Sequence, residues 1–168
     1  MIFAKTSKAA SRLSEEIRSK TFKKEYLVIV NGKMEKEKDT LTDFLWKDEK
    51  NNTSYVVKST KKNAKEAILD YEVIKYDKEK DLSILKINLH TGRHHQIRVQ
   101  LSSRMHAIYG DNKYHGRGKG TQICLWAYKL TIIHPTTKQK MEFLDLPEKK
   151  GMWNLINEKD IEKIKKSI

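Results

Sequence analysis

Apolar and polar residues alternate along the first part of the chain in a pattern that predicts a strand, a helix and a second strand. Residues 1–5 (MIFAK) have the composition of the end of a buried strand. Thr6 or Ser7 can cap a helix that runs to about Lys20, because a hydroxyl accepts a hydrogen bond from the first helical turn. Residues 22–31 (FKKEYLVIVN) are rich in strand-forming side chains and end at a glycine, which predicts a strand. The apolar stripe of the helix would consist of Ala10, Leu13 and Ile17.

The rest of the chain predicts more strands than helices. Charged residues interrupt the apolar ones in a way that is typical of short strands, hairpins and polar loops. The length of 168 residues suits a single domain. The order of elements favours an α+β fold, in which a mixed but largely antiparallel sheet is flanked by helices. We expect short strands within 33–65 around a turn at 48–52, a hairpin of 66–75 with 81–90, a helix over 93–104, strands over 122–134 and 140–143, and a helical segment over 148–168.

Composition adds a strong positive charge. The chain has 35 Lys and Arg against 22 Asp and Glu, a formal net charge of +13. This excess indicates an anionic partner, with nucleic acid as the leading candidate, although a merely soluble basic surface has the same composition. The single cysteine, Cys124, excludes a disulfide scaffold and a cysteine-based zinc site, and it fits a reducing cytoplasm. Apolar runs such as Tyr26 to Val30 are far below the roughly 20 residues of a membrane span, and we expect no signal peptide.

The richest cluster of candidate chemistry runs from Leu89 to Arg98 (LHTGRHHQIR). A strand is expected to end there, a glycine to turn the chain and a helix to begin, which directs backbone N–H groups toward a ligand. His94 and Arg98, four residues apart, would share a helix face, although a basic helix on a solvated surface is the alternative. No metal site is expected, because neighbouring histidines on a helix diverge. The candidate substrate contacts in this stretch are Arg93, His94 and Gln96.

Single residues elsewhere have both a structural and a chemical interpretation. Tyr26 lies within a strand, where tyrosines usually pack, and its hydroxyl can act as an acid or base only if a neighbouring charge tunes it. Asp111 follows a glycine and is expected to form a turn rather than to act as a catalyst. Trp126 and Tyr128 can stack on bases, but aromatic residues at strand spacing more often fill a core. The basic, glycine-rich loop of residues 110–120 supplies two further candidate contacts to RNA, Lys113 and Arg117.

Four stretches together resemble the RNA pseudouridine synthases of the RluA type, from the first residue to about Phe143. The third of them, with the sequence TGRHHQIR, is long and specific, and the four occur in the order of the family. They are Ile2–Thr6 with Ala9 and Ala10, Lys24–Tyr26 with Val30–Gly32, Thr91–Arg98 with Gly110, Asp111 and Tyr114, and Leu125–Ala127 with Leu130 and His134–Thr137.

The resemblance implies an isomerase without a cofactor, which detaches the base of a uridine in folded ribosomal or transfer RNA, turns it and rejoins it through carbon. The target base must leave its stack, as it does for other base-flipping enzymes. By motif position, Tyr26 matches the active-site tyrosine of the family, which would stack on the target base. Arg98 matches the arginine that pairs with a catalytic aspartate and favours its ionised form. Leu125 matches an apolar residue that lines the pocket.

The chain departs from the family at the catalytic aspartate, which belongs to a His-Arg-Leu-Asp motif that this sequence lacks. By analogy, that aspartate would fall roughly 7 residues before Met1. We therefore expect residues 1–168 to form a single partial catalytic domain, truncated at the N-terminus, with 148–168 as its C-terminal helical segment. A homodimer would cover a strand edge that truncation exposes. Smaller departures are Trp126 in place of a histidine and Met105–Ala107 in place of Gly-His-Pro.

Two functions are compatible with these features. The chain is either the catalytic half of an RNA-modifying enzyme, inactive by itself, or a non-catalytic basic module that binds RNA. The first hypothesis depends on Tyr26 and Arg98, and the second depends on the charge of +13 and on the loop from Lys113 to Lys119. Neither hypothesis requires a metal or a cofactor.

Overall fold

A computed structural model describes residues 2–19 and 21–166, which form one seven-stranded antiparallel sheet with helices on both faces. The strand order across the sheet is β3-β2-β4-β5-β1-β6-β7. The strands are β1 (Lys23–Asn31), β2 (Lys38–Asp48), β3 (Thr53–Val57), β4 (Lys65–Asp77), β5 (Leu82–Leu89), β6 (Leu125–Ile133) and β7 (Lys140–Leu144). The helices are α1 (Ser7–Arg18), α2 (Gln96–Ser102), the 3₁₀ helix η1 (Gly151–Leu155) and α3 (Glu158–Lys165).

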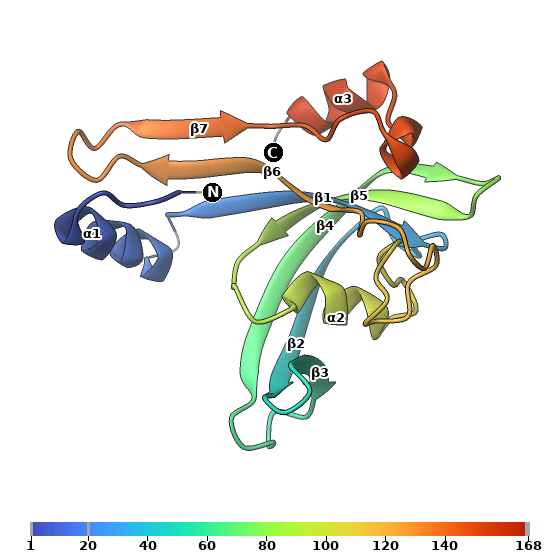
Figure 1. Ribbon diagram of the computed structural model, residues 1–168, viewed down its shortest axis with the longest axis horizontal. Coiled ribbons are helices and arrows are strands. Elements are labelled where there is room, and N and C mark those ends of the chain that lie inside the picture. The colour runs from blue at the N-terminus through green and yellow to red at the C-terminus, as the bar shows by residue number, and fades with distance from the viewer. Residues whose placement is uncertain (1, 20, 167–168) are drawn as a thin grey trace.

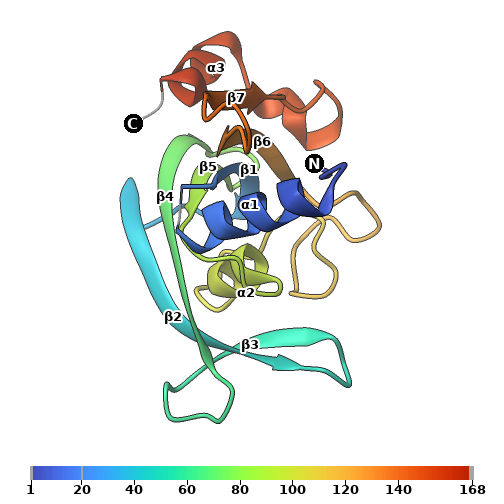
Figure 2. The same ribbon diagram turned by 90° about the vertical axis from the view of Figure 1, so that its left-hand side faces the viewer.

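The helices divide between the two faces of the sheet. Helices α1 and α2 lie below the sheet in Figure 1, whereas η1 and α3 lie above it, and Figure 2 shows the same division from the side. Two lysines tie the upper layer to β4: Lys75 Nζ donates to the Leu155 carbonyl at 3.0 Å, and Lys163 Nζ donates to the Ile74 carbonyl at 3.3 Å. Both faces of the central strands are therefore covered.

Strand β1 is the centre of the core. It pairs with β5 on one side and with β6 on the other, and Leu27, Val28, Ile29 and Val30 are each 0% exposed. A strand that is covered on both faces needs an unbroken apolar run, which explains the sequence LVIV at this position. Each such side chain contributes about 1.5–3 kcal/mol through burial. This strand holds Tyr26 in a fixed place, one residue before the run.

Strands β2 and β3 form an arm that projects away from the main sheet (Figures 1 and 2). We use "the arm" for residues 46–65, which comprise the end of β2, the turn, β3 and the loop to β4. Leu45 and Ala67, at the base of the arm, form a small buried cluster with Val99 of α2 and Tyr114 of the following loop. The arm is thus anchored to α2 by apolar contacts.

The α+β class is confirmed, and the sheet is antiparallel in every strand pair that the described residues form. The cap at Thr6 is confirmed too, because the Thr6 hydroxyl accepts from the Ala9 N–H at 3.2 Å. The strand expected over residues 1–5 is wrong for residues 2–5, which are irregular, and Met1 lies outside the described residues. The C-terminal helical segment is divided into η1 and α3.

The helix that we expected over residues 93–104 is shorter and begins at Gln96. His95 precedes it with a φ of 53°, a left-handed conformation that a right-handed helix excludes. The Gln96 side-chain oxygen accepts from the Thr91 hydroxyl at 2.8 Å and from the Arg93 N–H at 3.0 Å, which holds the preceding loop outside the helix. The expectation that His94 shares a helix face with Arg98 is therefore wrong.

Helix α1 covers the sheet only partly. Leu13 is half-buried, Ala10 is exposed and Ile17 is 53% exposed, so the predicted apolar stripe is not closed against the core. Leu13 and Ile17 instead face a hollow between this helix and the sheet.

We expect Ile29→Ala to lower the free energy of unfolding by about 3 kcal/mol, because it removes methyl groups from a filled core and leaves a cavity. Equilibrium urea denaturation measures this change. The same substitution at the 53% exposed Ile17 is the control, with an expected change of about 0.5 kcal/mol or less. Equal losses at the two positions would contradict the assignment of β1 as the centre of the core.

Candidate active site

Tyr26 lies in a hollow of about 530 Å³ between α1, β1 and β6. The wall is mainly apolar, with two lysines at its edge, and burial raises the pKa of the Tyr26 phenol. The phenol therefore stays protonated at neutral pH and offers a flat, uncharged ring that can lie against a planar group. The residues that line this hollow are Ile2, Leu13, Ile17, Phe22, Lys24, Tyr26, Ala127, Lys129 and Leu130.

The pairing register places Leu125 on the same face of the sheet as Tyr26. Tyr26 is paired with Ala127, and Val28 is paired with Leu125. Paired residues of antiparallel strands point to the same face, so Leu125 lies two positions along β6 from the partner of Tyr26. Helices α1 and α2 cover this face (Figures 1 and 2), so the structure brings Leu125, Tyr26 and the helix that carries Arg98 to one side of the sheet.

Arg98 forms a two-pronged ion pair with Asp111. Its Nε donates to Asp111 Oδ2 at 2.8 Å, and its Nη2 donates to Asp111 Oδ1 at 2.7 Å. The Arg98 side chain is 21% exposed and that of Asp111 is fully buried. The backbone N–H groups of Lys113 and Tyr114 also donate to Asp111 Oδ1, at 3.1 and 3.2 Å. The guanidinium is therefore held by one edge and does not point into bulk water.

The electrostatics of this pair fix both charges. Burial alone would raise the pKa of Asp111, but the hydrogen bonds and charge of Arg98 outweigh burial, and the pKa of the carboxyl is lowered. The pKa of Arg98 is raised, mainly by its hydrogen bonds to Asp111. Both side chains stay ionised at neutral pH, and the pair keeps a fixed geometry.

A hydrogen-bonded network extends from this ion pair to the arm. The Tyr114 ring lies 5.0 Å from the Arg98 guanidinium carbon, and its hydroxyl accepts from the Ser54 backbone N–H at 2.8 Å. The same hydroxyl lies 3.0 Å from His95 Nδ1. Burial, followed by the charge of Arg98, lowers the pKa of His95 to about 4. The His95 ring is therefore neutral at neutral pH and can accept a hydrogen bond from the Tyr114 hydroxyl.

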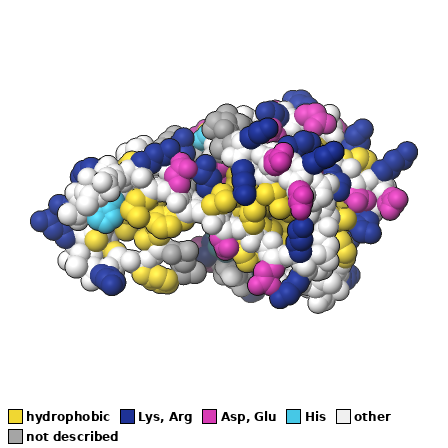
Figure 3. Space-filling model, turned by 90° about the horizontal axis from the view of Figure 1, so that it is seen from above, with side chains coloured by type: hydrophobic (Ala, Val, Ile, Leu, Met, Phe, Trp, Pro, Cys, Tyr) yellow, Lys and Arg dark blue, Asp and Glu magenta, His cyan; other side chains and the backbone are white. Residues whose placement is uncertain are grey.

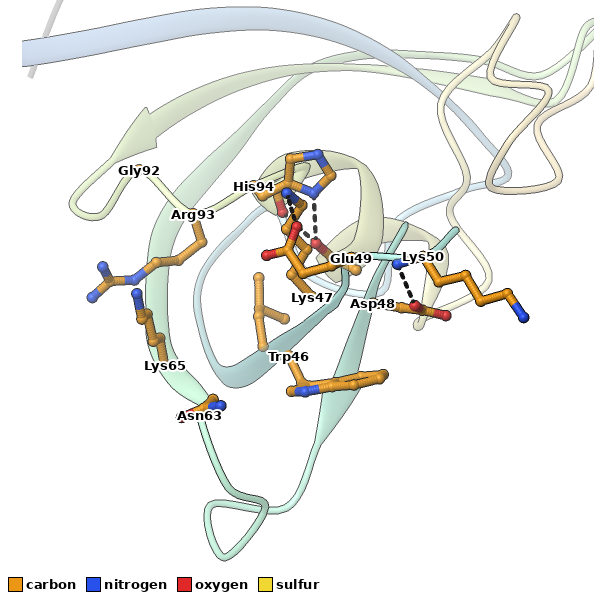
Figure 4. A pocket seen from close by; sticks show the side chains of 12 residues that line it. Trp46, Lys47, Asp48, Glu49, Lys50, Asn63, Lys65, Gly92, Arg93 and His94 are labelled. Atoms are coloured by element: carbon orange, nitrogen blue, oxygen red, sulfur yellow. Dashed lines mark hydrogen bonds and ion pairs between the residues drawn. The ribbon is translucent and has the colours of Figure 1, made fainter. Parts of the chain in front are cut away.

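Arg93 and His94 line a second and larger hollow, of about 730 Å³, between the arm and the loop before α2 (Figure 4). Arg93 Nε donates to the Glu66 carbonyl at 2.7 Å, and His94 Nδ1 lies 2.9 Å from the Ser54 hydroxyl. These two candidate contacts therefore belong to a different hollow from that of Tyr26.

The other three candidate contacts are bonded within the protein. Gln96 is 3% exposed, and its amide nitrogen donates to the Ile68 carbonyl at 3.1 Å. Lys113 Nζ donates to the carbonyls of Asn51 and Asn52 at 3.1 and 3.2 Å. The Arg117 guanidinium donates to Asn31 Oδ1 and to two carbonyls after β4. A direct substrate contact by these side chains would require such bonds to break.

Acidic and basic side chains are mixed on the face that carries α3. Figure 3 shows Lys and Arg side chains spread over this face with Asp and Glu among them, rather than gathered in one patch. Among the described residues, no group of three or more His, Cys, Asp and Glu side chains is placed to hold a metal ion. No helix in the described ranges is long and apolar enough to cross a membrane.

Sequence reasoning assigned Asp111 to a turn and missed its role as the partner of Arg98. Asp111 does shape the turn, because its carbonyl accepts from the Gly116 N–H at 2.8 Å. The ion pair spans 13 residues and depends on how the loop returns to α2, so no local spacing rule reveals it. The one available signal was the occurrence of Arg98, Asp111 and Tyr114 in the same family-like stretch.

The family model described as RNA pseudouridylate synthase matches residues 1–103. The chain belongs to this family. One similar protein is the uncharacterized RNA pseudouridine synthase YhcT of Bacillus subtilis, which is 31% identical over 83% of this chain and 45% of the relative. Another is the ribosomal large subunit pseudouridine synthase D of Vibrio cholerae, which is 30% identical over 85% of this chain and 47% of the relative. The tRNA pseudouridine synthase C of Haemophilus influenzae is 27% identical over 84% of this chain and 66% of the relative.

Solved structures agree on the fold of this pseudouridine synthase chain. Human RNA Pseudouridylate Synthase Domain Containing 1 superposes with a TM-score of 0.73 at 19% identity, over 98% of this chain and 74% of that one. The chain spans about half the length of the first curated relatives that it matches. The resemblance that the sequence motifs indicated is therefore confirmed at the level of family and fold.

We expect stability to fall as the pH is lowered from about 6.5 to about 4, in part because of His95. In this window the unfolded ring binds a proton and the folded ring does not, so the unfolded state binds more protons. His95→Asn removes the titrating ring while tolerating the left-handed backbone, and it should flatten the dependence. Urea denaturation at several pH values measures this pH dependence of the free energy of unfolding.

The control for this variant is His115→Asn, at an exposed residue whose φ of 63° is also left-handed. We expect this control to keep the pH dependence of the parent protein. If His95→Asn also keeps it, the folded His95 ring is not held neutral.

Proposed function

We propose that this chain is part of an enzyme that isomerises uridine to pseudouridine in ribosomal or transfer RNA, in the cytoplasm and without a cofactor. Membership of the pseudouridylate synthase family supports this reaction. The names of two similar proteins, one a ribosomal large subunit synthase and the other a tRNA synthase, support these two classes of RNA. The net charge of +13 is complementary to a phosphate backbone.

Tyr26 is proposed to receive the target base. Its half-buried ring borders a hollow with apolar walls, and a neutral phenol can stack on uracil without introducing a charge. A base that has left its helix needs such a flat partner in place of its neighbours in the stack. Leu125 does not line this hollow, but it lies on the same face of the sheet and is proposed to extend the apolar surface beyond it.

Arg98 is proposed to orient a reacting carboxylate, and its contacts carry the proposal. Asp111 occupies Nε and Nη2, whereas the described residues provide no hydrogen-bond partner for Nη1. A guanidinium has five N–H donors and can hold two carboxylates along two edges. The free edge is available to an aspartate such as the one in the family's His-Arg-Leu-Asp motif, which the given sequence does not contain. We therefore propose that residues 1–168 alone do not turn over substrate.

The competing function is a basic module that binds RNA without reacting with it. The net charge favours this alternative as much as it favours the enzyme. The two functions differ at Arg98, because a pure binder does not need a guanidinium edge that is free for a carboxylate.

We expect Arg98→Lys to lower the single-turnover rate of pseudouridine formation at least about 100-fold, because an ammonium cannot reproduce two-edged carboxylate binding. The assay uses the protein expressed with any in-frame sequence that precedes Met1 in its gene, and a uridine-labelled ribosomal or transfer RNA transcript. The affinity for RNA should change by less than about threefold, since one surface charge is retained.

Arg104→Lys is a matched control. Arg104 also forms a two-pronged ion pair, with Asp43 at 2.9 and 3.0 Å, and it lies shortly after α2. We expect Arg104→Lys to lower the free energy of unfolding by about as much as Arg98→Lys does, while the single-turnover rate stays at that of the parent protein. Normal RNA binding without turnover by the parent would favour the binding module. Equal rates for both variants and the parent would contradict the role of Arg98, and equal losses in both would mean that the Arg98 effect is structural.

A further inference from the structure

An aromatic pair, formed by the half-buried Trp46 and the exposed Tyr55, lies on the arm, away from the hollow of Tyr26. Trp46 on β2 and Tyr55 on β3 are directly paired across the strands, with ring centroids 6.3 Å apart and planes inclined by 27°. Tyr55 is 46% exposed. A large aromatic ring exposed to this extent on a projecting strand offers a flat surface to a partner.

The loop after β3 places a dense group of cations beside these rings. Residues 58–65 (KSTKKNAK) contain four lysines and no acidic residue. Within the described part of the chain no acidic side chain is ion-paired with any of the four, whereas Lys38, Lys47 and Lys86 on the neighbouring strands are each paired. Lys61 Nζ lies 4.8 Å from the centroid of the Trp46 ring. At least one unpaired cation, Lys61, therefore lies against the aromatic pair, and the other lysines follow it closely along the chain.

The hollow between the arm and the loop before α2 lies behind this surface, on the other face of the arm. Trp46, Lys65 and Arg93 line it together with His94. Leu45 and Ser54, the strand neighbours of Trp46 and Tyr55, face α2 and His94, so the two aromatic rings point to the other face of the arm. Lys50 lies at its other end, whereas Asp48 and Glu49 are the acidic residues of its lining. The hollow, of about 730 Å³, is large enough for a nucleotide-sized group.

We propose that the arm binds an unpaired segment of RNA, with a base stacked on the Trp46–Tyr55 pair and phosphates held by Lys58, Lys61 and Lys62. Stacking requires a base with a free face, which a duplex does not offer, while the lysines require a polyanion. This inference uses the proposed function only for the nature of the partner. The segment would be bound outside the hollow of Tyr26, so the arm would select RNA in which unpaired nucleotides lie near the target uridine.

The test measures the affinity of the given chain for a fluorescent oligouridine and for an RNA duplex of equal length, by anisotropy at several salt concentrations. Tyr55→Thr removes the ring and keeps a strand-forming side chain. We expect it to weaken oligouridine binding about tenfold and duplex binding by less than about twofold. Val56→Thr is the control, because Val56 is 37% exposed on the same strand and points to its other face.

A second variant tests the cations without disturbing the fold. Replacing Lys58, Lys61 and Lys62 by Gln should reduce the salt slope of log affinity by about 2, since each phosphate contact on a single strand contributes about 0.7. The control replaces three exposed lysines on the opposite face of the sheet, Lys149, Lys159 and Lys166, and should leave most of the slope intact.

Several results would overturn this inference. These are equal affinities for Tyr55→Thr and Val56→Thr, equal slopes for the two triple variants, or a dimer in sedimentation equilibrium that Tyr55→Thr converts to a monomer, which would make the aromatic pair a protein interface. Binding requires no isomerisation, so this result is independent of the activity of the Arg98 variants.

Discussion

The buried ion pair between Arg98 and Asp111 holds together the part of the molecule on which the proposed chemistry depends. Asp111 is fully buried and accepts four hydrogen bonds, two from Arg98 and two from backbone N–H groups. Removing one partner of such a pair leaves a buried charge without compensation, which costs about 3–5 kcal/mol when both charges are buried. The value here lies toward the lower end, because the Arg98 side chain keeps 21% exposure. The pair therefore fixes both the loop of residues 110–114 and the direction of the guanidinium.

The Tyr114 hydroxyl connects this fixed centre to the arm. Tyr114 stacks beside Arg98, and its hydroxyl contacts both the Ser54 backbone and the His95 ring. The neutral state of His95 is consistent with its position, because a second cation beside Arg98 would be repelled. The two hollows, one beside Tyr26 and the other under the arm, thus share a rigid connection through α2 and the loop that follows it.

The sequence predicted those parts of the fold that depend on local pattern. The LVIV run, the Thr6 cap, the hairpin of β4 with β5 and the turn before β3 all follow from residue types and their spacing. The start of α2 does not follow from local pattern, because it is set by the hydrogen bonds of the Gln96 side-chain amide, one of which reaches the Ile68 carbonyl 28 residues away.

The candidate site was predictable to a similar extent. Tyr26, Arg98 and Leu125 were identified through their motifs, and the structure places them on one side of the sheet, whereas their chemical roles stay predictions. The fixed orientation of Arg98 depends on a chain reversal that brings Asp111 back to α2, which no periodicity reports. The arm's aromatic pair also depends on register, since Trp46 and Tyr55 meet only when β2 and β3 pair as observed.

The most direct test is the single-turnover rate of the Asp111→Asn variant on saturating RNA, measured together with its unfolding free energy in protein expressed with any in-frame sequence that precedes Met1 in its gene. Asparagine keeps the shape of the side chain but removes the charge that holds the guanidinium. The account predicts a rate at least about tenfold lower in protein that remains folded and binds RNA normally, because a displaced catalytic contact loses most of its effect. A folded Asp111→Asn variant that reacts at the parent rate would contradict the central role of this pair.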